Sequence, residues 1–150
     1  MESPEVSEFA VDYAGFEIAL KNLERYHEIC LMQKEIGDDP DFEEITLMAE
    51  IKSFEICYAT LLKALHRHLT WNLGAVDLGY GAKPIFREAD RNGLLEDGAE
   101  HWFGYIEARN ITSHEYVIEK IGRFLELIPV FITDAIKLYE KMTGAPWKSK

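Results

Sequence analysis

The sequence predicts an all-α protein, an up-down bundle of four to five helices, from three observations. Apolar side chains recur at three- and four-residue steps over several long segments. Clusters of glycine, asparagine and proline separate these segments as turns. No segment alternates apolar and polar residues for long enough to build a sheet. With 150 residues, 47% of them hydrophobic, we expect one domain over residues 1–150.

Two long helices are expected first. The first covers about residues 6–36 and ends in the turn 37–40, because glycine ends a helix at low cost and the residue before a proline leaves the helical region. The second resumes the helical period at 42–69 and stops at the sequence 72–74, which ends in glycine. Since the turn between them is short, the two helices should lie antiparallel.

A short helix follows a loop at residues 74–81. Pro84 is well placed as its first residue, because proline at that position loses no intrahelical hydrogen bond. The helix should run through Arg91 and end at the asparagine and glycine of positions 92–93.

Two more helices complete the predicted bundle. Asp97 has the spacing of an N-cap, with an acidic residue three positions later, so a helix is expected to start there and run toward Arg109. The last helix covers about residues 117–142, and Pro129 within it should bend the helix without abolishing it.

The charge is distributed unevenly along the chain. A net charge of −11 argues against a nucleic-acid partner, because phosphate contacts need lysine and arginine. Residues 1–58, however, contain 15 acidic against 4 basic residues, whereas residues 59–150 contain 12 of each. The five bases between positions 63 and 91 form either a modest phosphate-facing surface or a mixed solvated face. Those bases are Lys63, Arg67, Lys83, Arg87 and Arg91.

Several classes of protein are excluded by composition. No stretch approaches the roughly 20 apolar residues of a membrane span, and the first residues lack the basic and apolar pattern of a secretory signal. We therefore expect a soluble, cytoplasmic protein. Cys30 and Cys57 each lie within an apolar helical pattern and are expected to be buried, reduced thiols. His66 and His68 project from different helix faces, so no metal site is expected from them.

The polar segment 105–116 stands between two strongly apolar helices. If the preceding helix continues through it, Arg109 and His114 lie about 140° apart around the helix axis and still edge one cleft. Alternatively, Thr112 and Glu115 form a capping box, and the last helix starts at His114. The sequence leaves both geometries open.

An arginine and a histidine at this spacing could together catalyse cleavage of a phosphodiester bond. An imidazole that titrates near neutrality moves protons, and a guanidinium holds a phosphate and stabilises its developing charge. These are the two needs of metal-free RNA cleavage. The alternative is structural, with Arg109 paired to Glu107 and His114 packed at a helix start.

The string Arg109-Asn110-x-x-x-His114-x-Tyr116 resembles the signature of the HEPN family. The likeness extends over about residues 10–142, where the chain is similar to the nucleotidyltransferase substrate-binding proteins. Other segments that carry it are 53–55, 61–65, 83–89 and 93–95, together with Trp102.

The resemblance implies a helical bundle that forms a homodimer, with the arginine and histidine of both copies facing a shared cleft. His114 would be the general base or acid, Arg109 would hold the scissile phosphate, and Asn110 would orient it or the nucleophile. Tyr116 would be the hydroxyl to which a small partner nucleotidyltransferase adds AMP. Lys63, Arg67 and Arg87 are the expected additional phosphate contacts, and no cofactor is expected.

Two functions follow from this interpretation. The first is a metal-independent ribonuclease toxin of a two-gene toxin–antitoxin module, silenced by its nucleotidyltransferase partner. The second is a non-catalytic subunit whose cleft presents nucleotide or RNA to that partner. The acidity of the chain favours the second function, and the complete Arg, Asn, His and Tyr set favours the first.

Overall fold

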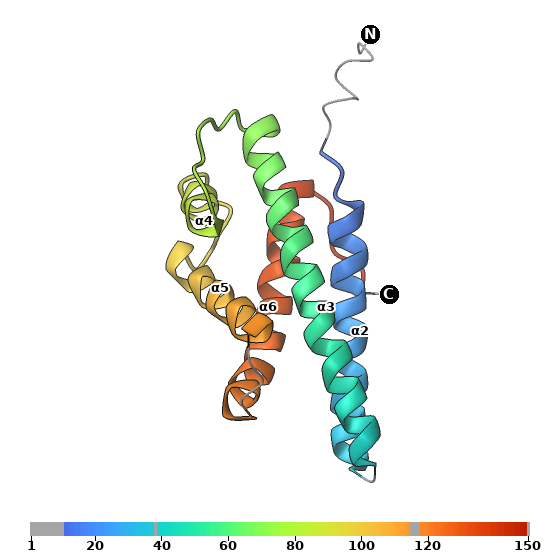
Figure 1. The fold of residues 1–150 in the computed structure, drawn as a ribbon. Coiled ribbons are helices and arrows are strands. Elements are labelled where there is room, and N and C mark those ends of the chain that lie inside the picture. Colours follow the sequence, from blue (N-terminus) through green and yellow to red (C-terminus); the bar gives the residue numbers. More distant parts are fainter. Residues whose placement is uncertain (1–10, 38, 115–117, 150) are drawn as a thin grey trace.

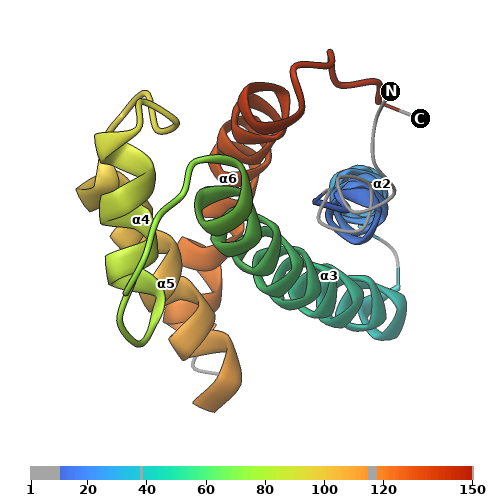
Figure 2. The same cartoon turned by 90° about the horizontal axis from the view of Figure 1, so that it is seen from above.

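The fold is all-α, as the sequence predicts. The computed structural model describes residues 11–37, 39–114 and 118–149, with the side chains of 113–121 outside that description; within these limits the chain forms five α-helices and no strand. Figure 1 shows the long helices α2 (Ala14–Ile36) and α3 (Pro40–Arg67) as the expected antiparallel pair. Seen from above, α3 and α6 (Ile118–Thr143) lie in the middle of the bundle. Helix α2 lies on one side of them, and α4 (Ala82–Arg91) and α5 (Ala99–His114) lie on the other (Figure 2).

The turn between α2 and α3 forms as predicted. Gly37 adopts a left-handed conformation, with φ of 62°, and its backbone N–H donates to the carbonyl of Gln33. The side chain of Asp39 then accepts the backbone N–H groups of Asp41 and Phe42, so it caps α3 directly before Pro40.

The start of α2 differs from the expectation. Residues 6–10 lie outside the described part of the chain, and residues 11–13 are not helical. The helix begins at Ala14, whose backbone N–H donates to Oδ1 of Asp12 at 2.9 Å. Tyr13 is the N-cap and provides no side-chain cap, so the bond to Asp12 satisfies one of the free N–H groups at this helix start.

The end of α3 is also more complex than predicted. It passes into a π-helical turn, η1 (His68–Asn72), in which the N–H of Leu73 donates to the carbonyl of His68. The His68 ring lies within this turn, with its Nδ1 2.7 Å from the hydroxyl of Tyr13 and 3.1 Å from the amide of Asn72. These bonds hold the start of the described chain against the end of α3.

Helices α4 and α5 both begin at residues other than the predicted ones. Helix α4 begins at Ala82, so Pro84 lies within its first turn, where it still costs no hydrogen bond. Helix α5 begins at Ala99, and the expected start at Asp97 is wrong because the N–H of Ala99 donates to Oδ2 of Asp90 instead. The side chain that caps α5 therefore comes from the end of α4.

Aromatic side chains dominate the centre of the core. The ring centre of Phe131 on α6 lies 4.9 Å from those of Phe54 on α3 and Tyr105 on α5, both edge to face. Trp102 stacks on Phe86 of α4 at 5.3 Å. One set of rings thus joins four helices, and α6 continues through Pro129 without interruption.

Both cysteines are free thiols, as expected, although only Cys57 is fully buried. Burial raises the pKa of the half-buried Cys30 to about 12, and it raises that of Cys57 as well. Among the described helices, none has the length and apolar character needed to cross a lipid bilayer.

Candidate functional site

A shallow groove of about 580 Å³ lies where α3, α4 and α5 meet. Helix α3 contributes most of its lining, with Ile85 added from α4 and Arg109 from α5. Of the described residues that line the groove, three are cationic, one is a histidine and none is acidic. These four are Lys63, His66, Arg67 and Arg109.

Packing of α5 places Arg109 in this groove. Its neighbour Ala108 is buried against the core, and the next buried position of the helix is Thr112, so the half-buried Arg109 emerges at the edge of the packed face. The Tyr58 ring lies beside it on α3. Burial raises the pKa of Tyr58 to about 12, and the positive charge of Arg109 offsets a part of that rise.

The structure decides between the two geometries that the sequence left open. Helix α5 continues from Ala99 through His114, and the hydroxyl of Thr112 donates to the carbonyl of Arg109 at 2.9 Å. Thr112 therefore bonds within α5 and does not cap a new helix there. Arg109, Asn110 and the backbone of His114 belong to one helix.

Not every predicted site residue falls within the described residues. Asn110 is exposed on α5. The side chain of His114, the last residue of α5, and the whole of Tyr116 lie outside the described part of the chain. Their roles stay predictions.

The predicted phosphate contacts separate into two places. Lys63 and Arg67 line the groove with Arg109. Arg87 is exposed on α4, and its guanidinium lies 5.4 Å from the ring centre of Phe103, on which Lys83 also rests. Arg87 thus packs against an aromatic ring outside the groove lining.

The comparisons with known proteins agree with this architecture. A family model described as nucleotidyltransferase substrate binding protein like matches residues 11–144. The chain belongs to this family. A curated relative from Haemophilus influenzae, named probable ribonuclease HepT, is 38% identical over 106 residues, which are 69% of this chain and 72% of the relative. No solved structure was found to match. The resemblance seen in the sequence is confirmed, and membership of the family extends over both long helices and the groove.

Sequence reasoning missed the partners of two histidines. His27 Nδ1 lies 2.6 Å from Oε1 of Glu50, and His101 Nε2 lies 2.6 Å from Oδ2 of Asp134. Each pair joins two different helices, so the spacing of residues along the sequence does not predict it. The one available signal was a charged residue, Glu50 or Asp134, at a position of the apolar helical stripe.

Proposed function

We propose that this protein is a metal-independent ribonuclease of the HEPN type, with its active cleft at the Arg109 groove. The main support for the proposal is the charge of the groove lining. In a chain with a net charge of −11, the described lining of this groove contains Lys63, Arg67 and Arg109 and no acidic residue. Such a concentration of positive charge attracts a phosphodiester, since phosphate contacts dominate the affinity of proteins for RNA. The name of the relative, probable ribonuclease HepT, supports the same activity.

The proposed chemistry needs a proton carrier and a phosphate holder. The 2′-hydroxyl attacks the adjacent phosphorus, the new P–O2′ bond forms, and the P–O5′ bond breaks to release a 5′-hydroxyl. His114 takes the proton of the nucleophile or gives one to the leaving oxygen. Arg109 holds the phosphate oxygens and stabilises the charge that develops on them, and Asn110 orients the phosphate or the nucleophile.

The continuity of α5 supports this division of roles. Residues 109 and 114 of one helix are about 7.5 Å apart along its axis and about 140° apart around it. At that separation an arginine and a histidine reach the two edges of one cleft. A second copy of the chain that contributes its own Arg109 and His114 would complete the cleft, so the proposal includes a homodimer.

A substrate-binding subunit is the second candidate. The description of the family favours it, because that description assigns substrate binding to a nucleotidyltransferase system. In this form the same groove holds a nucleotide or RNA and presents it to the partner enzyme. The acidic surface of the first helices then forms the contact with that partner.

An RNA-cleavage assay in the presence of a chelator tests the proposal. Wild type should cut single-stranded RNA. His114→Ala should lower the rate by at least about 100-fold, the usual contribution of a general acid or base. Arg109→Ala should lower it by at least about 100-fold because the developing charge on the phosphate loses its stabilisation. Equal cleavage by all three proteins would contradict the proposal. No cleavage by any of them, together with saturable nucleotide binding, would support the binding subunit.

A separate experiment tests the proposed modification of Tyr116. Incubation with the nucleotidyltransferase encoded nearby and ATP should add the mass of AMP to wild type and leave Tyr116→Phe unchanged. Tyr80 is fully exposed, so Tyr80→Phe is the matched control and should be modified like wild type. Modification of Tyr116→Phe at the wild-type level would exclude this residue.

A further inference from the structure

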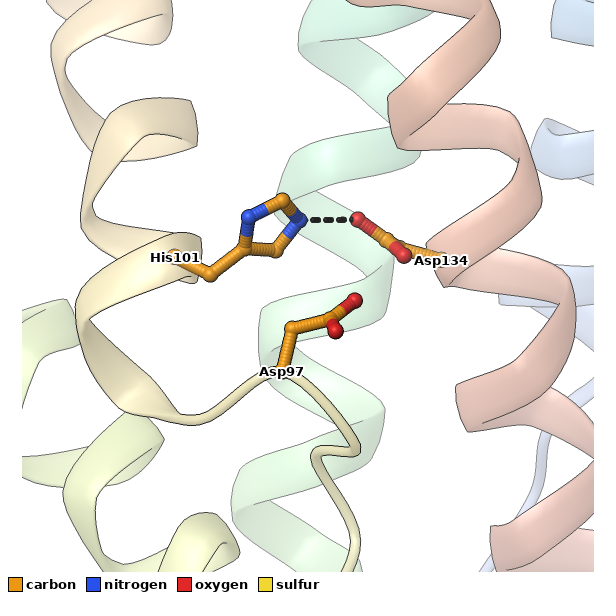
Figure 3. Close-up of side chains that lie close together, drawn as sticks. All are labelled: Asp97, His101 and Asp134. Carbon is orange, nitrogen blue, oxygen red and sulfur yellow. Dashed lines mark hydrogen bonds and ion pairs between the residues drawn. The ribbon is translucent and has the colours of Figure 1, made fainter.

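Three metal-binding side chains converge away from the Arg109 groove. Asp97 comes from the turn before α5, His101 from the first turns of α5, and Asp134 from α6 (Figure 3). One ligand atom from each lies within 4.8 Å of the other two. None of the three lines the groove that contains Arg109.

The three side chains of the cluster differ in their exposure to solvent. Asp134 has a side chain only 9% exposed and lies 2.6 Å from the His101 ring, whose exposure is 34%. Asp97 is exposed, and its carboxylate points toward the other two without a bond to either (Figure 3). Ligand atoms about 2.0–2.2 Å from one divalent ion lie about 3.0–3.4 Å from one another. An ion would therefore replace the His101–Asp134 hydrogen bond, with these two atoms moving slightly apart, and a rotation of the exposed Asp97 side chain would bring its carboxylate closer.

The buried carboxylate of Asp134 is held in place by a second hydrogen bond. The hydroxyl of Tyr105 donates a hydrogen bond to Oδ2 of Asp134. Hydrogen bonds of this kind from outer residues fix the carboxylates that hold metal ions in proteins.

We propose that Asp97, His101 and Asp134 bind one divalent transition-metal ion, of the Zn²⁺ or Mn²⁺ class, with water completing its coordination. An imidazole beside two carboxylates suits these ions better than Mg²⁺ or Ca²⁺, which prefer oxygen ligands alone. The ion ties the turn before α5 to α6. Its role is to stabilise the position of α5, and it takes no part in the proposed cleavage.

Calorimetric titration of the untagged, chelator-treated protein with ZnCl₂ and MnCl₂ tests this site. Wild type should bind one ion per chain, and its melting temperature should rise when the ion is added. Asp97→Asn and His101→Gln should weaken binding at least 10-fold and remove that rise. Asp97→Asn is the decisive variant, because this exposed residue bonds to neither neighbour in Figure 3 and its change leaves the His101–Asp134 pair intact.

His27→Gln is the matched control, because His27 also pairs with a buried carboxylate, Glu50, but among the described residues this pair belongs to no group of three metal-binding side chains. It should bind the ion like wild type. The proposal is overturned if wild type shows no saturable binding of either ion, or if Asp97→Asn binds as wild type does. A loss of binding in His27→Gln equal to that in His101→Gln would place the ion elsewhere and overturn it too.

Discussion

Arg109 of α5 and Lys63 of α3 line the same groove, although they are far apart in the sequence. The packing of α5 against α3 brings them together. Since Arg67 lies one helical turn after Lys63, the two helices present three cations to one place. The groove therefore brings three of the four predicted phosphate contacts together, and Arg87 lies outside its lining.

Loss of the groove cations should weaken RNA binding in a salt-dependent way. Lys63→Ala and Arg67→Ala should each lower the slope of log affinity against log salt by about 0.7, the value for one phosphate contact with a single strand. Binding to a fluorescent RNA that carries a 2′-deoxy substitution, measured from 50 to 300 mM salt, gives this slope. Arg87→Ala should change it less, because Arg87 packs on Phe103 outside the groove lining.

A suitable control for those variants is Arg91→Ala. Arg91 is an exposed arginine of α4 that pairs with Glu88 at 2.8 Å. Its loss should leave the slope within error of wild type. If Arg91→Ala and Arg67→Ala lower the slope equally, the affinity comes from general surface charge and not from the groove.

Truncation of Phe131 should destabilise the protein strongly. This fully buried ring contacts Phe54 and Tyr105, so Phe131→Ala removes the centre of the aromatic core and should cost about 3–5 kcal/mol in the free energy of unfolding. Urea denaturation followed by circular dichroism measures this. Phe42→Ala is the control, because Phe42 is 46% exposed and should cost far less. Similar losses in both variants would contradict the described core.

Acidification should weaken the fold through His68. Burial lowers the pKa of this histidine below its usual 6.5, and its Nδ1 accepts a hydrogen bond from the amide of Asn72. The unfolded chain therefore binds the proton more readily, and the free energy of unfolding falls as the pH drops below about 6.5 toward the folded-state pKa. Denaturation curves at pH 7.5 and 5.5 measure this fall.

His68→Asn isolates that contribution. Its amide oxygen replaces Nδ1 as an acceptor and does not titrate, so the variant should lose less stability between the two pH values than wild type does. An equal or greater loss in His68→Asn would show that His68 does not contribute to the pH dependence.

Local signals in the sequence predict most of the fold. Helical periods, Gly37 and Pro40 place the two long helices and their turn correctly. The differences lie at helix starts, where a single hydrogen bond can decide the position, and at the end of α3, which passes into a π-helical turn. Asp90 caps α5 from the end of α4, and no local pattern near Asp97 reveals that contact.

The site could be predicted only in part. The likeness of Arg109 and His114 to the family signature points to this segment, but it does not say whether α5 continues through it. The buried Thr112 bonds to the carbonyl of Arg109 and so belongs to the helix. The pairing of His101 with Asp134 depends on how α5 packs against α6. Tertiary contacts of this kind produce no recognisable residue spacing in the sequence.

On the proposed function, the groove lined by Lys63, Arg67 and Arg109 receives a phosphodiester. NMR titration with a short RNA blocked by 2′-deoxy substitution tests it directly, because the complex forms without cleavage. The largest shifts should belong to the side-chain N–H signals of Arg109 and Arg67 and to the backbone signals of Tyr58 and Leu62. Shifts confined to α2 or to the exposed face of α4, with the groove signals unchanged, would contradict it.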